Sequence, residues 1–233
     1  MNAYQPIEAI TLDLDDTLWP VLPTLIAAEK TLREWLHSNT PATASLLAEQ
    51  ATEIRRALVE GQPENAHNMS WIRAELLREA MRQAGDDPAL ATEAFELFLA
   101  ARQQVVFYDE VLDVLSGWAD KYPLVAVSNG NADIHRVGLG KLFRGAISAH
   151  EQGCAKPDRR MFEAACALSG VPPERTLHIG DDWTLDIQAA RAVSMQTAWI
   201  KRPDLKHDKA PSESHGEPFF KDISALDKVL HAR

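Results

Sequence analysis

Short runs of apolar and β-branched residues recur along the chain, and each run stops at polar residues, glycine or proline. Such runs predict buried β-strands rather than helices, because they are short and are bounded by turn-forming residues. The first expected strand spans residues 7–14 and ends in a burst of acidic residues. The other expected strands are residues 124–128, 145–148, 176–179 and 196–200.

Between the first two strands the apolar residues follow a helical period instead. Pro20 and Pro23 indicate a break after the first strand, and no strand pattern follows before residue 107. Four helices are expected in this stretch, at residues 24–37, 41–60, 70–84 and 88–103. We therefore expect residues 19–106 to form an all-helical cap domain.

From residue 107 onward, expected helices and strands alternate. Helices are expected at residues 110–122, between the second and third strands, at 158–169, after the fourth strand and at 223–230. Such alternation is typical of a parallel sheet covered on both faces. The predicted fold class is α/β, a Rossmann-like doubly wound sheet built from residues 1–18 and 107–233 with the cap inserted. Residues 203–218 are rich in proline, serine and charge and predict a surface loop.

Composition narrows the function further. The chain has 233 residues, 45% of them hydrophobic and 25% charged, which is typical of a globular protein with its own core. A formal net charge of −10 disfavours nucleic acid and anionic membranes as partners, so an anionic substrate would need local cations. Two cysteines and no basic leader segment favour a cytoplasmic protein with free thiols. We expect it to be a monomer or a homodimer, between which the sequence does not decide.

Polar residues gather just after the expected strands. In open α/β sheets ligands bind beyond the carboxyl ends of the strands, so these residues are candidates for a shared site. The candidates are Asp13, Asp15, Asp16 and Thr17 after the first strand, Ser128 and Asn129 after the second, Lys156 near the third, and Asp181, Asp182 and Asp186 after the fourth.

This set of residue types fits phosphate-ester cleavage. Two carboxylates about 4 Å apart repel by roughly 4 kcal/mol in a partly solvated site, so a cation is needed, and oxygen ligands favour Mg²⁺. One carboxylate can attack phosphorus to form an aspartyl-phosphate, while a second protonates the leaving oxygen and then activates water. Ser128 and Lys156 would stabilise charge on the transferring phosphoryl group. His178 lies inside an expected strand, where a packed histidine is the better interpretation.

In order and spacing, these four motifs resemble those of the haloacid dehalogenase superfamily of phosphohydrolases, over nearly the whole chain. The resemblance implies Asp13 as nucleophile and Asp15 as general acid/base. It further implies phosphate binding by Ser128, Asn129 and Lys156, Mg²⁺ binding by Asp13, the Asp15 carbonyl and Asp181, and a supporting role for Asp186 beside the metal or Lys156.

The inserted helical domain is similar to the first cap type of that superfamily, which places substrate choice on the cap. The motifs at residues 13–18, 128–131 and 178–182 resemble those of bacterial flavin-pathway phosphatases. That branch implies 5-amino-6-(5-phospho-D-ribitylamino)uracil, FMN or sugar phosphates as substrates. A broad-specificity phosphatase acting on sugar phosphates, phosphoglycolate or nucleotides is the alternative.

Three further alternatives share the fold. A metal-free 2-haloacid dehalogenase would use the same aspartate nucleophile, but an acidic residue at the position of Asp15 is not typical of that branch. A phosphomutase would hand the phosphoryl group to another hydroxyl, and the sequence separates it poorly from a phosphatase. A non-catalytic binding protein is disfavoured because all four motifs are intact.

Overall fold

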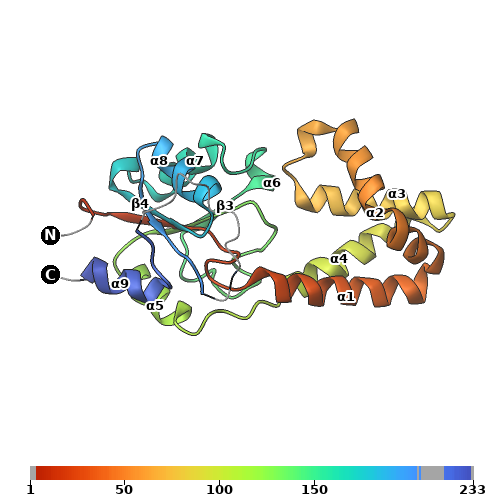
Figure 1. The fold of residues 1–233 in the computed structure, drawn as a ribbon, viewed down its shortest axis with the longest axis horizontal. Helices are drawn as coiled ribbons and strands as arrows, with labels where there is room; N and C mark the ends of the chain where they lie inside the picture. The colour runs from red at the N-terminus through yellow and green to blue at the C-terminus, as the bar shows by residue number, and fades with distance from the viewer. Residues whose placement is uncertain (1–3, 204, 206–217, 232–233) are drawn as a thin grey trace. The chain divides into compact units, whose positions relative to one another are not determined.

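The structure, a computed structural model, describes residues 4–203, 205 and 218–231. The chain divides into two compact units, each with its own core (Figure 1). One unit consists of Met1–Val21 together with Val106–Arg233, and the other of Leu22–Val105. Most of residues 203–218, the expected surface loop, lie outside the described residues.

The first unit is built on a five-stranded parallel sheet in the order β3-β2-β1-β4-β5. Its central strand, β1, pairs Ile10 with Leu124 of β2 on one side and with Leu177 of β4 on the other. Strands buried on both faces read as continuous apolar runs, which explains the sequence pattern. The expected α/β fold with a parallel sheet and an inserted helical region is confirmed. The strands are β1 Ala9–Leu12, β2 Leu124–Ser128, β3 Gly145–Ser148, β4 Thr176–Gly180 and β5 Gln196–Trp199.

Helices cover both faces of this sheet. Figure 1 shows α7 and α8 on one side of the strands and α5 and α9 on the other. Met161 and Phe162 of α7 pack with Val125 and Val127 of β2 in one buried cluster. On the other side, Trp118 of α5 donates its indole N–H to Asp227 of α9. The helices are α5 Val111–Ala119, α6 Ala149–Gln152, α7 Arg159–Ser169, a π-helical turn Trp183–Gln188, α8 Ala189–Ala192 and α9 Ile223–His231.

The prediction of a helix between the second and third strands is wrong. The described residues 129–144 form turns and no helix. Ile134, Val137 and Leu139 of this segment are buried, which produced the helix-like pattern. Gly138 has a φ of +91°, a left-handed conformation that interrupts a right-handed helix.

The second unit is helical throughout its described elements. Its helices are α1 Val21–Asn39, α2 Pro41–Gly61, α3 Met69–Ala84 and α4 Ala91–Arg102, with 3₁₀ turns at Pro63–Asn65 and Pro88–Leu90. The first helix begins three residues before the expected start, because Pro23 sits in its first turn, where backbone N–H groups need no intrahelical acceptor. Leu32, Leu77, Met81 and Phe98 form its core.

Capping residues define the ends of α3, and the residue after it connects this helix to α2. Asn68 accepts a hydrogen bond from the backbone N–H of Trp71 at the start of α3, and Gly85 closes that helix with a φ of +80°. Asp86, which follows, accepts hydrogen bonds from both the backbone and the hydroxyl of Thr43 on α2. In the described part of the chain, no helix combines the length and the apolar character that crossing a bilayer requires.

Candidate active site

The sheet order brings residues from distant parts of the chain to one edge. Because β1 lies between β2 and β4, the residues that follow these strands are neighbours, and Asp13, Ser128 and Asp181 follow them or end them. The backbone N–H of Asp13 donates to the carbonyl of Ile179, 2.9 Å away, which continues the β1–β4 pairing by one step. The first and fourth sequence motifs therefore meet at this edge.

Lys156 lies at the centre of the site. Its Nζ is 2.5 Å from Asp13 Oδ1 and 2.6 Å from Asp186 Oδ1, and only 3% of its side chain is exposed. Burial alone would lower the pKa of Lys156, but the charges of Asp13 and Asp186 outweigh burial and raise it. Lys156 is therefore a fixed cation held between two carboxylates.

Asn129 holds the backbone of Lys156 in place. Its side-chain amide donates to the Lys156 carbonyl at 3.0 Å and accepts from the Lys156 N–H at 2.7 Å. Ser128 accepts a hydrogen bond from the N–H of Gly130 at 3.0 Å, which shapes the turn after β2. Of the three residues expected to bind phosphate, Asn129 thus has its amide occupied by backbone, while the Ser128 hydroxyl proton remains available to donate.

Three carboxylates form a cluster that could hold a metal ion. One oxygen from each of Asp13, Asp181 and Asp186 lies within 4.8 Å of the others. Hard oxygen donors at this spacing fit Mg²⁺, so the chemistry of the donor set agrees with the expected cofactor. Thr17 donates to Asp181 Oδ1 at 3.3 Å, and the Trp199 indole donates to the Asp181 carbonyl at 2.8 Å. Asp13 and Asp181 are therefore close enough to share one ion.

Asp186 belongs to a buried chain of hydrogen bonds. His178 Nε2 lies 3.1 Å from Asp186 Oδ1, and its Nδ1 lies 2.8 Å from the hydroxyl of Thr11 in β1. Burial lowers the pKa of His178, which keeps its ring neutral at pH 7, and the expected packed histidine is observed. Gly180 leaves room for this arrangement, since a Cβ there would come within 2.3 Å of the Asp186 carboxyl carbon.

Asp15 is held in place by its own turn. The indole N–H of Trp19 donates to Asp15 Oδ1 at 2.8 Å, and the N–H of Asp16 donates to the Trp19 carbonyl at 2.7 Å. Asp16 has a φ of +62°, and its carboxylate accepts the N–H of Val21 at the start of α1. One carboxylate oxygen of Asp15 is therefore held by a neutral hydrogen-bond donor, the Trp19 indole.

The turn after β1 is also tied to the far end of the sheet. Arg202, which is buried, donates to the carbonyl of Thr17 at 2.6 Å and to Glu110 at 2.5 Å, and stacks over the ring of Tyr108. At the fourth motif, Asp182 is exposed and accepts the N–H groups of Thr184 and Leu185, so it caps the following helical turn.

Sequence reasoning missed three supporting residues, Thr11, Trp19 and Arg202, and it gave His178 no role beyond packing. Thr11 and His178 sit inside apolar strands, and the only sequence signal for their pairing is that both are polar at buried positions. Trp19 lies four residues after Asp15, and in a loop of unknown shape this spacing does not indicate that the two side chains are in contact. Arg202 follows the last strand, the one strand end from which no candidate was taken.

Two of the three clustered carboxylates, Asp13 and Asp181, are costly to ionise in the metal-free protein. Burial raises the pKa of Asp13 to about 7, with Lys156 opposing the shift and Asp186 adding to it. Burial, together with the charges of Asp13 and Asp186, raises the pKa of Asp181 to about 9. By contrast, Lys156 and His178 overcome the effect of burial on Asp186 and lower its pKa to about 2.

These shifts predict how stability depends on pH. Because the folded protein holds protons on Asp13 and Asp181 that the unfolded chain releases near pH 4, stability without metal should fall as pH rises from about 4 to about 9. Mg²⁺ should restore more stability at about pH 8.5 than at about pH 5, since it binds the ionised carboxylates. Urea unfolding with EDTA or with Mg²⁺ at both pH values measures this. Metal-free stability that rises with pH over this range would contradict the assignment.

Comparisons with known proteins place the chain in a family. Residues 7–194 match the haloacid dehalogenase-like hydrolases. The chain is 34% identical to the 5-amino-6-(5-phospho-D-ribitylamino)uracil phosphatase YigB of Escherichia coli, over 86% of this chain and 87% of that protein. It is 28% identical to a phosphoserine phosphatase of Thermus thermophilus, over 84% of this chain and 89% of that protein.

A solved structure agrees closely in fold. The structure described as a 2-haloacid dehalogenase from Pseudomonas syringae matches with a TM-score of 0.89 and 33% identity, covering 97% of this chain and 99% of that one. The chain therefore belongs to the haloacid dehalogenase-like hydrolases. Within that family it is a phosphatase, the class that the sequence motifs predict and that both curated relatives share.

Proposed function

We propose that the protein is a Mg²⁺-dependent phosphatase that forms an aspartyl-phosphate on Asp13 and hydrolyses it with the help of Asp15. The observation that carries this proposal is the grouping of Asp13, Asp181 and Asp186 within 4.8 Å, with the buried ammonium of Lys156 paired to Asp13 and Asp186. Such a centre combines a carboxylate nucleophile with the positive charge that a transferring phosphoryl group needs.

In the first half of the reaction, a carboxylate oxygen of Asp13 attacks phosphorus while the bond to the leaving oxygen breaks. Asp15 gives its proton to that oxygen, which leaves as an alcohol. Lys156 and the Ser128 hydroxyl would donate to the phosphoryl oxygens as negative charge builds there. The hydrogen bonds from Asn129 to the Lys156 backbone keep the lysine in position for this.

In the second half, the ionised Asp15 removes a proton from water, whose oxygen attacks phosphorus. The bond between Asp13 and phosphorus breaks, inorganic phosphate leaves, and both carboxyl groups return to their starting forms. The Trp19 indole holds Asp15 through both steps. A Mg²⁺ ion bound by Asp13, Asp181 and the Asp15 carbonyl would supply the charge that keeps the acidic cluster ionised.

The dehalogenase alternative has support of its own, because a structural relative at 33% identity is described as a 2-haloacid dehalogenase. A dehalogenase needs neither a proton donor for an alkoxide nor a metal. In this chain the Trp19 indole holds the carboxylate of Asp15, two residues after Asp13, and Asp181 belongs to the carboxylate cluster. Both features favour phosphoryl transfer.

For the substrate we propose a small cytoplasmic phosphate monoester, with 5-amino-6-(5-phospho-D-ribitylamino)uracil or FMN as first candidates. The support is the 34% identity to the Escherichia coli phosphatase of that uracil derivative, over most of both chains. Because the 28% identical relative is a phosphoserine phosphatase, substrates that lack a ring belong in the same screen.

The test measures inorganic phosphate released from a panel of phosphate monoesters: the ribitylaminouracil phosphate, FMN, phosphoglycolate, phosphoserine and nucleoside monophosphates. We expect release in Mg²⁺, loss of release in EDTA and recovery when Mg²⁺ is added back. The ribitylaminouracil phosphate should give the highest kcat/KM. A higher kcat/KM for phosphoserine would move the substrate assignment to the other relative's class.

Two further measurements separate the alternatives. Turnover of chloroacetate in EDTA, without phosphate release in Mg²⁺, would establish the dehalogenase and overturn the phosphatase. Rearranged sugar phosphate in place of free phosphate would establish a phosphomutase. We expect neither product.

A further inference from the structure

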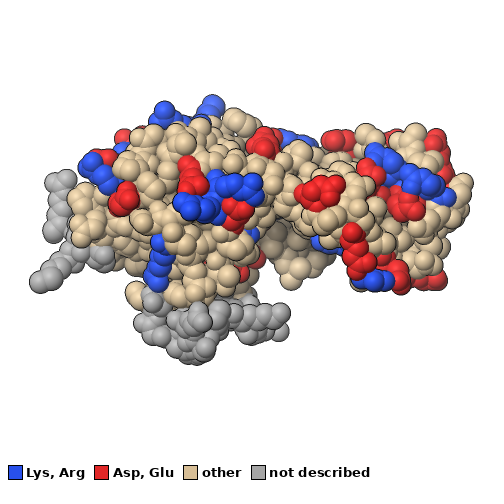
Figure 2. Space-filling model, turned by 90° about the horizontal axis from the view of Figure 1, so that it is seen from above, with Lys and Arg blue, Asp and Glu red and all other residues tan. Residues whose placement is uncertain are grey.

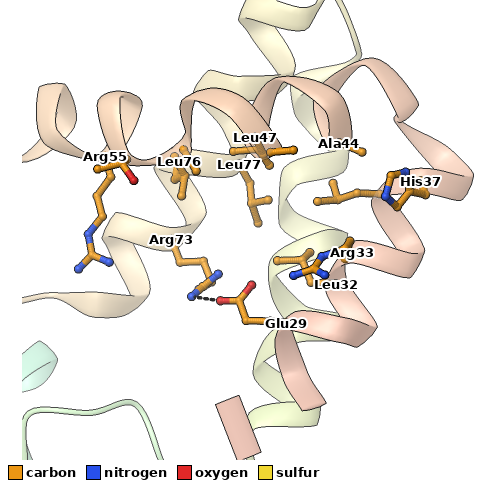
Figure 3. Close-up of a pocket in the computed structure, with 14 residues that line it drawn as sticks. Glu29, Leu32, Arg33, His37, Ala44, Leu47, Arg55, Arg73, Leu76 and Leu77 are labelled. Atoms are coloured by element: carbon orange, nitrogen blue, oxygen red, sulfur yellow. Dashed lines mark ion pairs between the residues drawn. The ribbon is translucent and has the colours of Figure 1, made fainter. Parts of the chain in front are cut away.

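The helical unit contains a hollow of about 590 Å³ between α1, α2 and α3 (Figure 3). All of the residues that line it belong to Leu22–Val105, so the hollow is a property of this unit alone. Its volume lies within the range of roughly 300–1,000 Å³ that is usual for sites of small organic ligands. No step of the proposed catalytic mechanism uses it.

One part of the lining is apolar. Leucine side chains from all three helices meet there, and Figure 3 shows Leu47, Leu76 and Leu77 together on one side of the hollow. Leu32 and Leu77 belong to the core of this unit, so this part is fixed by packing. Ala44, Ala48 and Ala51 of α2 have short side chains, which leave the hollow open. The surface therefore suits an apolar molecular body.

The other part of the lining is positively charged. Three arginines and one glutamate line the hollow: Arg33, Arg55, Arg73 and Glu29. Figure 3 shows that the arginines come from three different helices, Arg33 from α1, Arg55 from α2 and Arg73 from α3. The chain as a whole has a net charge of −10, and Figure 2 shows acidic and basic side chains interspersed over one face, whereas arginines outnumber the single glutamate in this lining.

The arginines differ in how they are held. Arg73 is 2.5 Å from Glu29 and lies 3.9 Å over the ring of Phe98, so its charge is compensated and its position fixed. Within the described ranges, neither Arg33 nor Arg55 forms an ion pair with a carboxylate, and the Arg55 guanidinium donates to the sulfur of Met69 at 3.9 Å. Two guanidinium groups therefore remain available to an anion beside an apolar surface.

We propose that this hollow binds a small organic anion, with its apolar body on the leucines and its carboxylate or phosphate at Arg33 or Arg55, which lie on either side of the Arg73–Glu29 pair in Figure 3. Guanidinium groups form paired, charge-assisted hydrogen bonds with both kinds of anion, which gives the site its chemical preference. A neutral apolar molecule would gain only the leucine contacts. The inference stands independently of the proposed catalytic function.

The test uses two fluorescent probes of the same shape and binds them to the full chain in EDTA. The anionic probe is 1-anilinonaphthalene-8-sulfonate, and its neutral counterpart is N-phenyl-1-naphthylamine. In the Arg33→Gln/Arg55→Gln double variant, Kd for the anionic probe should rise about fivefold, as expected when an exposed charge contact is lost, while Kd for the neutral probe stays unchanged. Phosphorylated and carboxylated competitors then show which anion the site prefers.

Two variants control for location and charge. Arg82→Gln removes an exposed arginine of α3 that pairs with Glu79 outside the hollow, and it should leave both affinities unchanged. Ala51→Trp fills the hollow and should weaken both probes. An anionic-probe affinity that the double arginine variant leaves within about twofold would overturn the proposal. Equal weakening of both probes by that variant would overturn the anion preference, and full binding to Ala51→Trp would place the probes elsewhere.

Discussion

Replacing Asp13 by asparagine should give a folded protein that releases almost no phosphate from p-nitrophenyl phosphate in Mg²⁺. The amide has the shape of the carboxylate, and its oxygen can still accept the hydrogen bond from Lys156, but it is a poor nucleophile toward phosphorus. We expect kcat to fall by about 10⁴-fold or more, as for other nucleophiles that act within a catalytic group. Initial rates of phosphate release measure this.

The matched control is Asp182→Asn, at an exposed carboxylate next to Asp181 in sequence whose side chain caps a helical turn and is not one of the three clustered carboxylates. Asp182 is exposed and caps a helical turn, and asparagine caps equally well, so activity and stability should both be retained. The Asp13 variant should unfold in urea within about 1 kcal/mol of the parent, because Asp186 still pairs with Lys156. Retained phosphatase activity in a folded Asp13→Asn protein would remove Asp13 from its role.

Replacing Lys156 by methionine should affect stability as well as activity. The change leaves the buried carboxylates of Asp13 and Asp186 without the ammonium that lies between them. Breaking a buried ion pair by removing one partner costs about 3–5 kcal/mol, and losing a charge donor at the reacting group costs about 10²–10³-fold in kcat. Urea unfolding and phosphate release, assayed where the variant is folded, measure the two effects.

The dependence on pH identifies the cause of that instability. Protonation neutralises the unpaired carboxylates, so the deficit relative to the parent should shrink as pH falls from about 8 to about 5. The double variant Lys156→Met/Asp186→Asn removes one of the two charges and should recover part of the lost stability. Lys141→Met, at an exposed lysine, serves as the control and should change neither property. A deficit that does not vary with pH would show that lost packing, and not charge, is responsible.

Much of the fold could be predicted from the sequence because its three inner strands, β2, β1 and β4, are buried throughout and its edge strands are short apolar runs. Residues 124–128 and 145–148 coincide with β2 and β3, since each forms a short apolar run bounded by polar or turn-forming residues. The segment 129–144 was predicted wrongly, because its buried apolar residues mimic a helical period while Gly138 takes a left-handed conformation. A glycine's φ depends on the packing of the turn and not on its neighbours in sequence.

The residues of the candidate site could also be predicted only in part. Its carboxylates and lysine could be collected from strand ends, because parallel topology places those ends together. The hydrogen bonds of Asn129 to the Lys156 backbone could not, because they join two loops whose approach depends on the folded sheet. The bond from Trp19 to Asp15 likewise depends on the positive φ of Asp16, which no residue pattern specifies.

The position of β1 in the middle of the sheet has a consequence for how the chain acquires its structure on the ribosome. Strand β1 is synthesised first, but it cannot pair with β2 until Leu124 has been synthesised. It cannot pair with β4 until Leu177 has been synthesised. The whole helical unit, with its own core, is synthesised in between and can become compact while β1 is still unpaired. Nascent chains that stop before β4 therefore carry Asp13 directly after a strand with one unpaired edge, and only a nearly finished polypeptide closes the centre of the sheet.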